Sequence, residues 1–239
     1  LAKTEGFYMT SPDADVHVVQ RTTNPRGSEV DLVTEGGTYP VALPDAGTFN
    51  VANAAIAATC SALIGIDLEA AAANIAAMDP IPGRYNTIDS SAGSWVVVDY
   101  AHTPDAIANV VAESRSHVAG KIIVVIGAGG DRDREKRPLM GRAAGTADLV
   151  VVTDDNPRSE DPDKIVADVV SGIQPGPEVV IERDRRLAIR RALLSAGADD
   201  AVLILGKGHE TGQEFADETL PFDDAAVARH EILGLESTP

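Results

Sequence analysis

The sequence predicts an α/β protein whose C-terminal part folds around a doubly wound, mostly parallel sheet. From residue 95 onward, short apolar runs alternate with longer helical stretches, so that the order strand, loop, helix repeats along the chain. Each apolar run is nearly continuous, as is typical of strands covered by helices on both faces. Crossovers long enough to hold a helix favour parallel pairing of these strands.

Nine elements are expected in this part of the chain. The strands are expected at residues 95–99, 122–126, 149–153, 179–182 and 202–205, and the helices at residues 105–117, 138–147, 163–173 and 185–196. In a sheet of this kind, ligands bind at the carboxyl ends of the strands. The loops that follow the strands are therefore the first place to search for a site.

The beginning of the chain has a different, β-like pattern. Residues 16–19 form one apolar run, and residues 30–33 and 39–43 form two more. The last two runs flank a Glu-Gly-Gly segment at residues 35–37, which is typical of a hairpin turn. This part of the chain is therefore expected to contain antiparallel strands.

Two helices and a domain junction are expected next. Residues 48–64 are rich in alanine and other apolar residues, which indicates a buried helix, and a second helix is expected at residues 68–78. Residues 80–83 contain two prolines and a glycine, which break the chain. The sequence thus predicts two domains, at residues 1–84 and 85–239.

Composition and charge exclude several functional classes. The 239 residues are 44% apolar and carry 20 Lys and Arg against 37 Asp and Glu, a formal net charge of -17. Such a chain repels nucleic acid and anionic lipid over most of its surface. Its one cysteine, Cys60, cannot form a disulfide within the chain, and no Cys/His cluster has the spacing of zinc ligands. Without a signal peptide or an apolar run of membrane-spanning length, the expected location is cytoplasmic.

Basic residues nevertheless gather in one segment of this acidic chain. Within eleven positions lie Arg132, Arg134, Lys136, Arg137 and Arg142. A local cationic patch suggests a small anionic ligand, and the alternative is a solvated loop and helix face of mixed charge.

Four polar loops follow predicted strands. They are dense in Gly, Asp, Arg, Lys and His, and they comprise residues 99–105, 127–133, 154–158 and 206–210. Each loop alone could be structural, because turns need Gly, Pro and Asn for their geometry. Because the carboxyl ends of parallel strands meet at one edge, we expect the four loops to share a ligand site.

The loop that begins at Gly127 is not a good dinucleotide-binding fingerprint. The third glycine of that fingerprint would fall at position 132, which is Arg132. An arginine beside a glycine turn is better suited to bind a carboxylate or a phosphate.

The Asp-Asn-Pro-Arg segment that begins at Asp155 is the most informative motif. Arg158 offers a planar fork for a carboxylate, while Asp155 and Asn156 can accept hydrogen bonds from an ammonium group. Glu210 adds another acceptor from a neighbouring loop. Together they would satisfy an amino acid. In the alternative, structural interpretation, the segment starts a turn and Arg158 pairs with Glu160.

The junction region has candidates of its own. Asn50 and Asn53 are three residues apart, so on the first turn of a helix they face the same way, although they could be ordinary caps. Arg84 stands at the domain junction, where it could reach a ligand in the cleft.

Six motifs in order, GTFNVAN, PIPGR, DYAHTPD, GAGGDRDREKRPLMG, DNPR and GKGHE, resemble the Mur ligase family over about residues 47–224. Within the family, the chain is similar to members that add meso-diaminopimelate to UDP-N-acetylmuramoyl-L-alanyl-D-glutamate in peptidoglycan precursor synthesis. The resemblance implies the C-terminal part of an ATP-binding central domain, then a Rossmann-like domain that binds the amino acid. It also implies an ATP-dependent amide ligase that acts through an acyl phosphate, with Mg²⁺ offsetting phosphate charge.

The resemblance also implies residue roles. Asn50 and Asn53 match positions near adenine, Arg84 matches the arginine near the ATP phosphates, and Asp99 matches a ribose-binding acid. Seven residues match diaminopimelate-binding positions: Arg132, Asp155, Asn156, Pro157, Arg158, Gly206 and Glu210. Relatives that add lysine lack that last arginine of the DNPR motif. Three further residues are expected in the cleft without an assigned role: His102, Lys207 and His209. No catalytic residue and no metal ligand is assigned.

Departures from the family pattern limit what this chain is expected to do alone. The family begins with a uridine-nucleotide-binding domain, and its central domain carries a Gly-Lys-Thr phosphate loop, neither of which occurs in this sequence. The fragment is therefore expected to be inactive alone. Two alternatives stay open: a related ligase that adds another amino acid, such as L-lysine or glutamate, and a non-catalytic binding module or oxidoreductase on a similar sheet.

Overall fold

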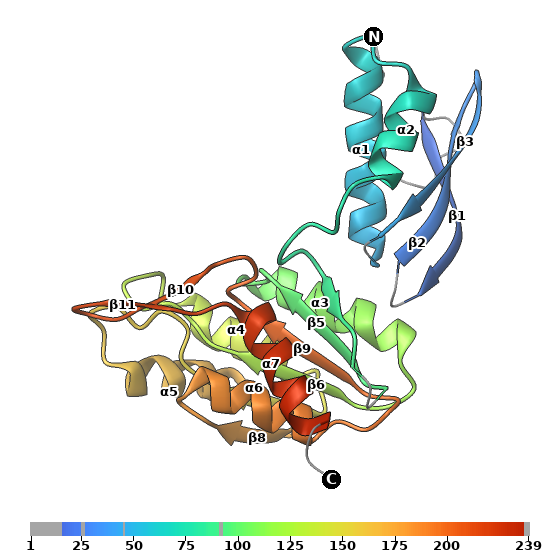
Figure 1. Ribbon diagram of the computed structural model, residues 1–239. Coiled ribbons are helices and arrows are strands. Elements are labelled where there is room, and N and C mark those ends of the chain that lie inside the picture. Colours follow the sequence, from blue (N-terminus) through green and yellow to red (C-terminus); the bar gives the residue numbers. More distant parts are fainter. Residues whose placement is uncertain (1–15, 25–26, 45, 91–92, 237–239) are drawn as a thin grey trace. The chain divides into compact units, whose positions relative to one another are not determined.

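A computed structural model describes residues 16–24, 27–44, 46–90 and 93–236. The first fifteen residues, where no signal peptide is expected, lie outside this range. The chain divides into two compact units, Leu1–Ile81 and Pro82–Pro239 (Figure 1). Their assignment to a central and a C-terminal domain stays a prediction.

The first unit is a three-stranded antiparallel sheet packed against two helices. Its elements are β1 (His17–Asn24), β2 (Gly27–Thr34), β3 (Gly37–Leu43), α1 (Thr48–Leu63) and α2 (Leu68–Ala76). The predicted hairpin joins β2 to β3, with Thr34 opposite Gly37.

The core of this unit lies between the sheet and the helices. Val30 and Leu32 alternate along β2 and are both 1% exposed, and Val41 joins them from β3. Val51 and Ala58 on α1 complete the same cluster. Small alanine side chains let one face of α1 approach the sheet closely. The other face is exposed at Ile56 (43%) and Leu63 (62%), so the expectation of a buried helix holds for one face only.

The second unit is built on a six-stranded sheet with the order β4-β5-β9-β6-β7-β8. The strands are β4 (Asn86–Ile88), β5 (Trp95–Asp99), β6 (Ile122–Ile126), β7 (Leu149–Val152), β8 (Glu178–Ile181) and β9 (Ala201–Leu205). Strand β4 pairs antiparallel with β5, and the other pairs are parallel. The prediction of a mostly parallel sheet is confirmed.

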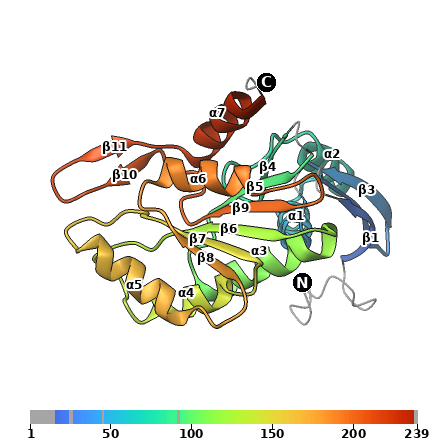
Figure 2. The same cartoon turned by 90° about the horizontal axis from the view of Figure 1, so that it is seen from below.

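Helices cover both faces of this sheet, as the doubly wound prediction requires. On one face lie α3 (Pro104–His117), α4 (Lys136–Ala144) and α5 (Pro162–Gly172), and on the other lie α6 (Arg185–Leu194) and α7 (Asp224–Glu236) (Figure 2). Strands β5, β6 and β9 are buried along their whole length. Among the described residues, no helix is both long and apolar enough to cross a membrane.

Three parts of the second unit were not predicted from the sequence. They are the edge strand β4, the hairpin formed by β10 (Gly212–Glu214) and β11 (Thr219–Pro221), and the helix α7. Strands of three residues are too short to show a hydrophobic period. The hairpin matters for function, because the backbone N–H of Arg158 donates to the carbonyl of Glu214 on β10.

Candidate functional site

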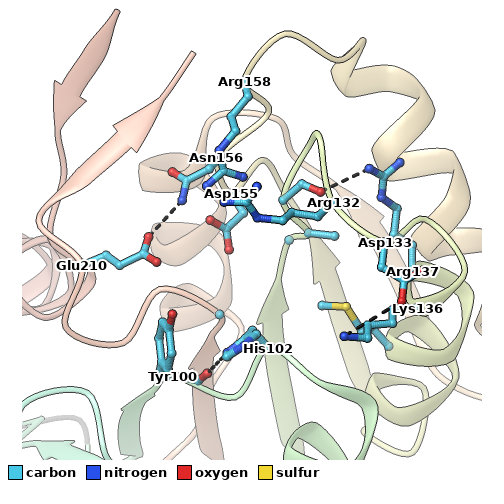
Figure 3. A pocket seen from close by; sticks show the side chains of 15 residues that line it. Tyr100, His102, Arg132, Asp133, Lys136, Arg137, Asp155, Asn156, Arg158 and Glu210 are labelled. Carbon is cyan, nitrogen blue, oxygen red and sulfur yellow. Dashed lines mark hydrogen bonds and ion pairs between the residues drawn. The ribbon is translucent and has the colours of Figure 1, made fainter. Parts of the chain in front are cut away.

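The four polar loops converge on one cavity at the carboxyl ends of the strands. Strands β5, β9, β6 and β7 are neighbours in the sheet, so the loops that follow them meet at the same edge. The cavity measures 350 Å³, which suits a small ligand. It is lined by Tyr100, His102, Gly127, Ala128, Gly129, Arg132, Asp133, Lys136, Arg137, Met140, Asp155, Asn156, Arg158, Gly206 and Glu210 (Figure 3).

Most of the residues predicted to bind the amino acid line this cavity. Pro157 is the exception: it is buried and supports the turn, and its carbonyl lies so close to Gly130 that no side chain fits there. Of the three residues without an assigned role, His102 lines the cavity, whereas Lys207 is buried behind it and His209 is exposed. His209 instead contacts the ring of Tyr100, with 5.2 Å between the ring centroids.

Several lining residues were missed by the sequence analysis. Lys136, Arg137 and Met140 lie on α4, and their side chains form part of the cavity wall together with the Gly127 loop. The signal that pointed to them was the basic run, which suggested an anionic ligand without showing which members would face it. The structure places Arg132, Lys136 and Arg137 at the cavity, whereas Arg134 and Arg142 lie outside its lining.

Two of the three nitrogens of the Arg158 guanidinium already donate hydrogen bonds within the protein. Its Nε donates to Glu214 Oε2 (2.6 Å) and its Nη1 donates to the carbonyl of Gly130 (2.9 Å). Within the described part of the chain, Nη2 has no hydrogen-bond partner, so it is available to a carboxylate in the cavity. The alternative pairing with Glu160 is not formed. Glu214 holds the arginine instead, from the hairpin that the sequence did not reveal.

Glu160 belongs to a second ion pair that supports the site from behind. Arg137 is buried, and its Nη2 donates to Glu160 Oε2 (2.7 Å) and to the carbonyl of Gly129 (3.2 Å). Its Nη1 donates to Asp168 (3.0 Å) on α5. One guanidinium therefore ties the Gly127 loop to the Asp155 loop. Its hydrogen bond lowers the pKa of Glu160 to about 2.

This lowered pKa predicts an acid-sensitive stability difference. At neutral pH, Glu160→Gln should be less stable than the parent, because the ionised carboxylate that bonds Arg137 is lost. The difference should shrink as pH falls from about 5 towards 2, since protonation removes the same bond from the parent. Urea unfolding across this range measures it, with the exposed Glu218→Gln as the control. A difference that does not change with pH would contradict the assignment.

Asn156 is held in a different way from that expected. Its Oδ1 already accepts from Lys207 Nζ (2.8 Å) and from the N–H of Glu214 (2.9 Å). Its Nδ2 donates to Glu210 Oε2 (2.9 Å). The amide thus orients Glu210, and the carboxylates of Asp155 and Glu210 are the acceptors that remain for an ammonium group.

The start of the second unit places two more predicted residues. Asp99 is buried at the end of β5, where its carboxylate accepts from the N–H groups of Tyr85 and Ala101, each at 2.7 Å. Burial raises the pKa of Asp99 above its ordinary value. The Arg84 guanidinium lies 5.2 Å from the centroid of the Tyr100 ring. Asp99 therefore fixes the backbone directly after Arg84.

The first unit has a separate, mostly apolar cavity of 220 Å³. Asn50 and Asn53 both line it, as expected for two residues three apart on the first turn of α1. Asn50 Nδ2 donates to the carbonyl of Ala46 (2.7 Å), which leaves its amide oxygen to a ligand. A mostly apolar lining that includes two amide side chains suits a flat, hydrogen-bonding ring.

No metal site is built by these residues alone. The described residues contain no group of three or more His, Cys, Asp or Glu side chains placed to hold a metal ion. Mg²⁺ is usually held by one or two carboxylates together with substrate phosphates, so the Mg²⁺ implied by the family resemblance stays a prediction.

Comparison with known proteins identifies the class. Residues 83–208 match the family model described as Mur ligase, glutamate ligase domain. The chain belongs to the Mur ligase family.

Three individual relatives that are similar to the chain carry the same name. The chain is 45% identical over 214 residues to the UDP-N-acetylmuramoyl-L-alanyl-D-glutamate--2,6-diaminopimelate ligase of Alkalilimnicola ehrlichii, covering 89% of this chain and 43% of that protein. The ligase of the same name from Gloeobacter violaceus is 44% identical over 227 residues, covering 94% and 46%. A solved structure of a ligase of this name aligns with a TM-score of 0.69 at 39% identity, covering 96% of this chain and 47% of that one. The chain spans less than half the length of each.

Proposed function

We propose that this chain is the amino-acid-binding part of an ATP-dependent amide ligase. The whole enzyme would add meso-diaminopimelate to UDP-N-acetylmuramoyl-L-alanyl-D-glutamate in the cytoplasm. One observation carries the proposal: a single cavity presents an available guanidinium nitrogen of Arg158 and the carboxylates of Asp155 and Glu210. Figure 3 shows the Glu210 carboxylate on one side of that cavity and the Lys136 ammonium on the other.

This charge pattern distinguishes between amino acids. Diaminopimelate carries a carboxylate and an ammonium at each end, so its second end needs a cation and an anion together. Arg158 can bind that carboxylate, while Asp155 and Glu210 can accept from that ammonium. L-Lysine has the ammonium but no second carboxylate, so it offers no partner to Arg158 Nη2. The named relatives with the same activity support this choice.

Within each unit, the residues that are predicted to bind ATP have a proposed role of their own. The apolar cavity with Asn50 and Asn53 would hold the adenine ring. Arg84 would bind phosphate, and Asp99 would accept from a ribose hydroxyl while it holds the backbone after Arg84. When bound, ATP supplies the phosphoryl group that activates the substrate carboxylate. The residues of this chain bind and orient the reactants.

Calorimetric titration of the chain with meso-diaminopimelate, with L-lysine as the control, tests the proposal. We expect heat for diaminopimelate and none for lysine, with weak affinity because an incomplete cleft leaves the ligand partly solvated. Heat for lysine and none for diaminopimelate would instead favour a lysine-adding ligase. No heat for either would overturn the claim that this chain holds the amino-acid site.

A further inference from the structure

Lys207 is a fully buried cation that touches the cavity only through other residues. It is 0% exposed and does not line the cavity itself. Its Nζ donates to Asn156 Oδ1 (2.8 Å), to Glu210 Oε2 (3.2 Å) and to Asp155 Oδ1 (3.4 Å). All three of its partners line the cavity.

A buried ammonium is stable only when it is paired and hydrogen-bonded. Lys207 has three donors, and each has one acceptor. The contacts leave Asp155 Oδ2 and Glu210 Oε1 without hydrogen-bond partners among the residues that the structure describes. Asp155 and Glu210 each bind this nitrogen through one carboxylate oxygen, which leaves the second oxygen of each to a ligand in the cavity that both residues line.

The backbone around Lys207 is fixed as well. Gly206 donates its N–H to the carbonyl of Asp99 (3.1 Å), and Glu210 donates its N–H to the carbonyl of Lys207 (3.0 Å). Gly206 has a φ of 114°, and a Cβ there would lie 2.7 Å from Asp155 Oδ2. Only glycine at this position gives that oxygen its room. The loop at residues 206–210 therefore buries the Lys207 ammonium outside the cavity lining, while the carboxylates of Asp155 and Glu210 line the cavity.

We propose that Lys207 is a positioning residue for recognition of an ammonium group in the substrate. It binds one oxygen of each carboxylate and thereby holds the other two oxygens as a preformed site. Without Lys207, the two carboxylates would repel each other and separate. The inference rests on the proposed function, because it assumes that the ligand of this cavity carries an ammonium beside its second carboxylate.

Comparing the binding of meso-diaminopimelate and L-2-aminopimelate isolates the contribution of Lys207 to ammonium recognition. L-2-Aminopimelate keeps both carboxylates of meso-diaminopimelate but lacks the second ammonium. The parent chain should bind diaminopimelate at least about tenfold more tightly than L-2-aminopimelate, as expected for a charge-assisted hydrogen bond. In Lys207→Met, affinity for diaminopimelate should fall about 10- to 100-fold and the preference should nearly vanish.

Lys136→Met is the matched control, because Lys136 lines the same cavity but makes no contact with Asn156, Asp155 or Glu210. It should weaken both ligands by a similar factor and keep the preference. A Lys207→Met variant that keeps the preference would overturn the inference, and so would one that binds diaminopimelate more tightly, because Lys207 would then compete with the ligand. A parent chain that binds neither ligand would overturn the proposed function instead.

Nuclear magnetic resonance of the lysine ammonium groups tests the same point in the unmodified chain, should Lys207→Met not fold. The lysines at 121, 136 and 164 are exposed, so their ammonium protons exchange quickly with water. Lys207 should give a slowly exchanging signal that shifts with meso-diaminopimelate and much less with L-2-aminopimelate. Equal shifts for the two ligands would contradict a role in ammonium recognition.

Discussion

Replacing Arg158 by alanine should weaken the binding of meso-diaminopimelate by about 100-fold, which would place it below calorimetric detection. The substitution removes the guanidinium that is available to the second carboxylate, and a charge-assisted hydrogen bond of this kind contributes about 1.5–3 kcal/mol. Its loss also leaves Glu214 on β10 without its partner, so an unpaired carboxylate would stand near the ligand. The measurement is the same titration as for the parent chain.

Arg134→Ala is the control for this prediction. Arg134 belongs to the same basic run, but its side chain is 69% exposed and it does not line the cavity. Its partner Glu160 also keeps its bond to Arg137. Arg134→Ala should therefore bind diaminopimelate as the parent does. If Arg158→Ala keeps its affinity for diaminopimelate, the choice of that amino acid over lysine is wrong.

Replacing Asp224 by alanine should destabilise the second unit by about 3–5 kcal/mol, because it leaves the buried charge of Arg185 without its partner. Asp224 and Arg185 are both 0% exposed, and Arg185 binds the two carboxylate oxygens at 2.8 and 2.7 Å. Arg185 Nη2 also donates to the carbonyl of Leu205, directly before the Gly206 loop (3.0 Å). Urea unfolding followed by the fluorescence of Trp95, the chain's one tryptophan, reports on this unit.

Two further variants sharpen this second prediction. Asp217 is exposed in the turn between β10 and β11, so Asp217→Ala should change stability by less than about 0.5 kcal/mol. The double variant Arg185→Met with Asp224→Leu should recover much of the loss, since it removes both buried charges. An Asp224→Ala variant as stable as the Asp217→Ala control would show that the pair does not hold α7 to the sheet.

Continuous apolar runs made much of the sheet predictable. Strands β5 and β6 begin and end at the expected residues, because each contains a nearly continuous apolar run bounded by polar or glycine residues. Helix α7 was missed for the opposite reason. It buries two charged residues, Asp224 and Glu231, whose partners lie on α6, 39 to 45 residues earlier in the chain. A hydrophobic pattern does not reveal a helix that is anchored by ion pairs.

In the site as well, features set by neighbouring residues were predicted, and contacts between residues far apart in the sequence were not. The loops were found because polar residues directly follow predicted strands, and strand ends meet at one edge of a parallel sheet. The partners within the site were not found. Glu160 was the alternative partner for Arg158 because it is two residues away, whereas the structure pairs Arg158 with Glu214, 56 residues away. From the sequence alone, Lys207 could only be assigned to a polar loop, because its three acceptors are known only from the structure.

A crystal structure of this chain grown with meso-diaminopimelate tests the central claim most directly. We expect one carboxylate of the ligand within hydrogen-bond distance of Arg158 Nη2 and the adjacent ammonium between the carboxylates of Asp155 and Glu210. Lys207 should remain in place behind them. Ligand bound elsewhere, or bound in this cavity with its carboxylate away from Arg158, would contradict the account.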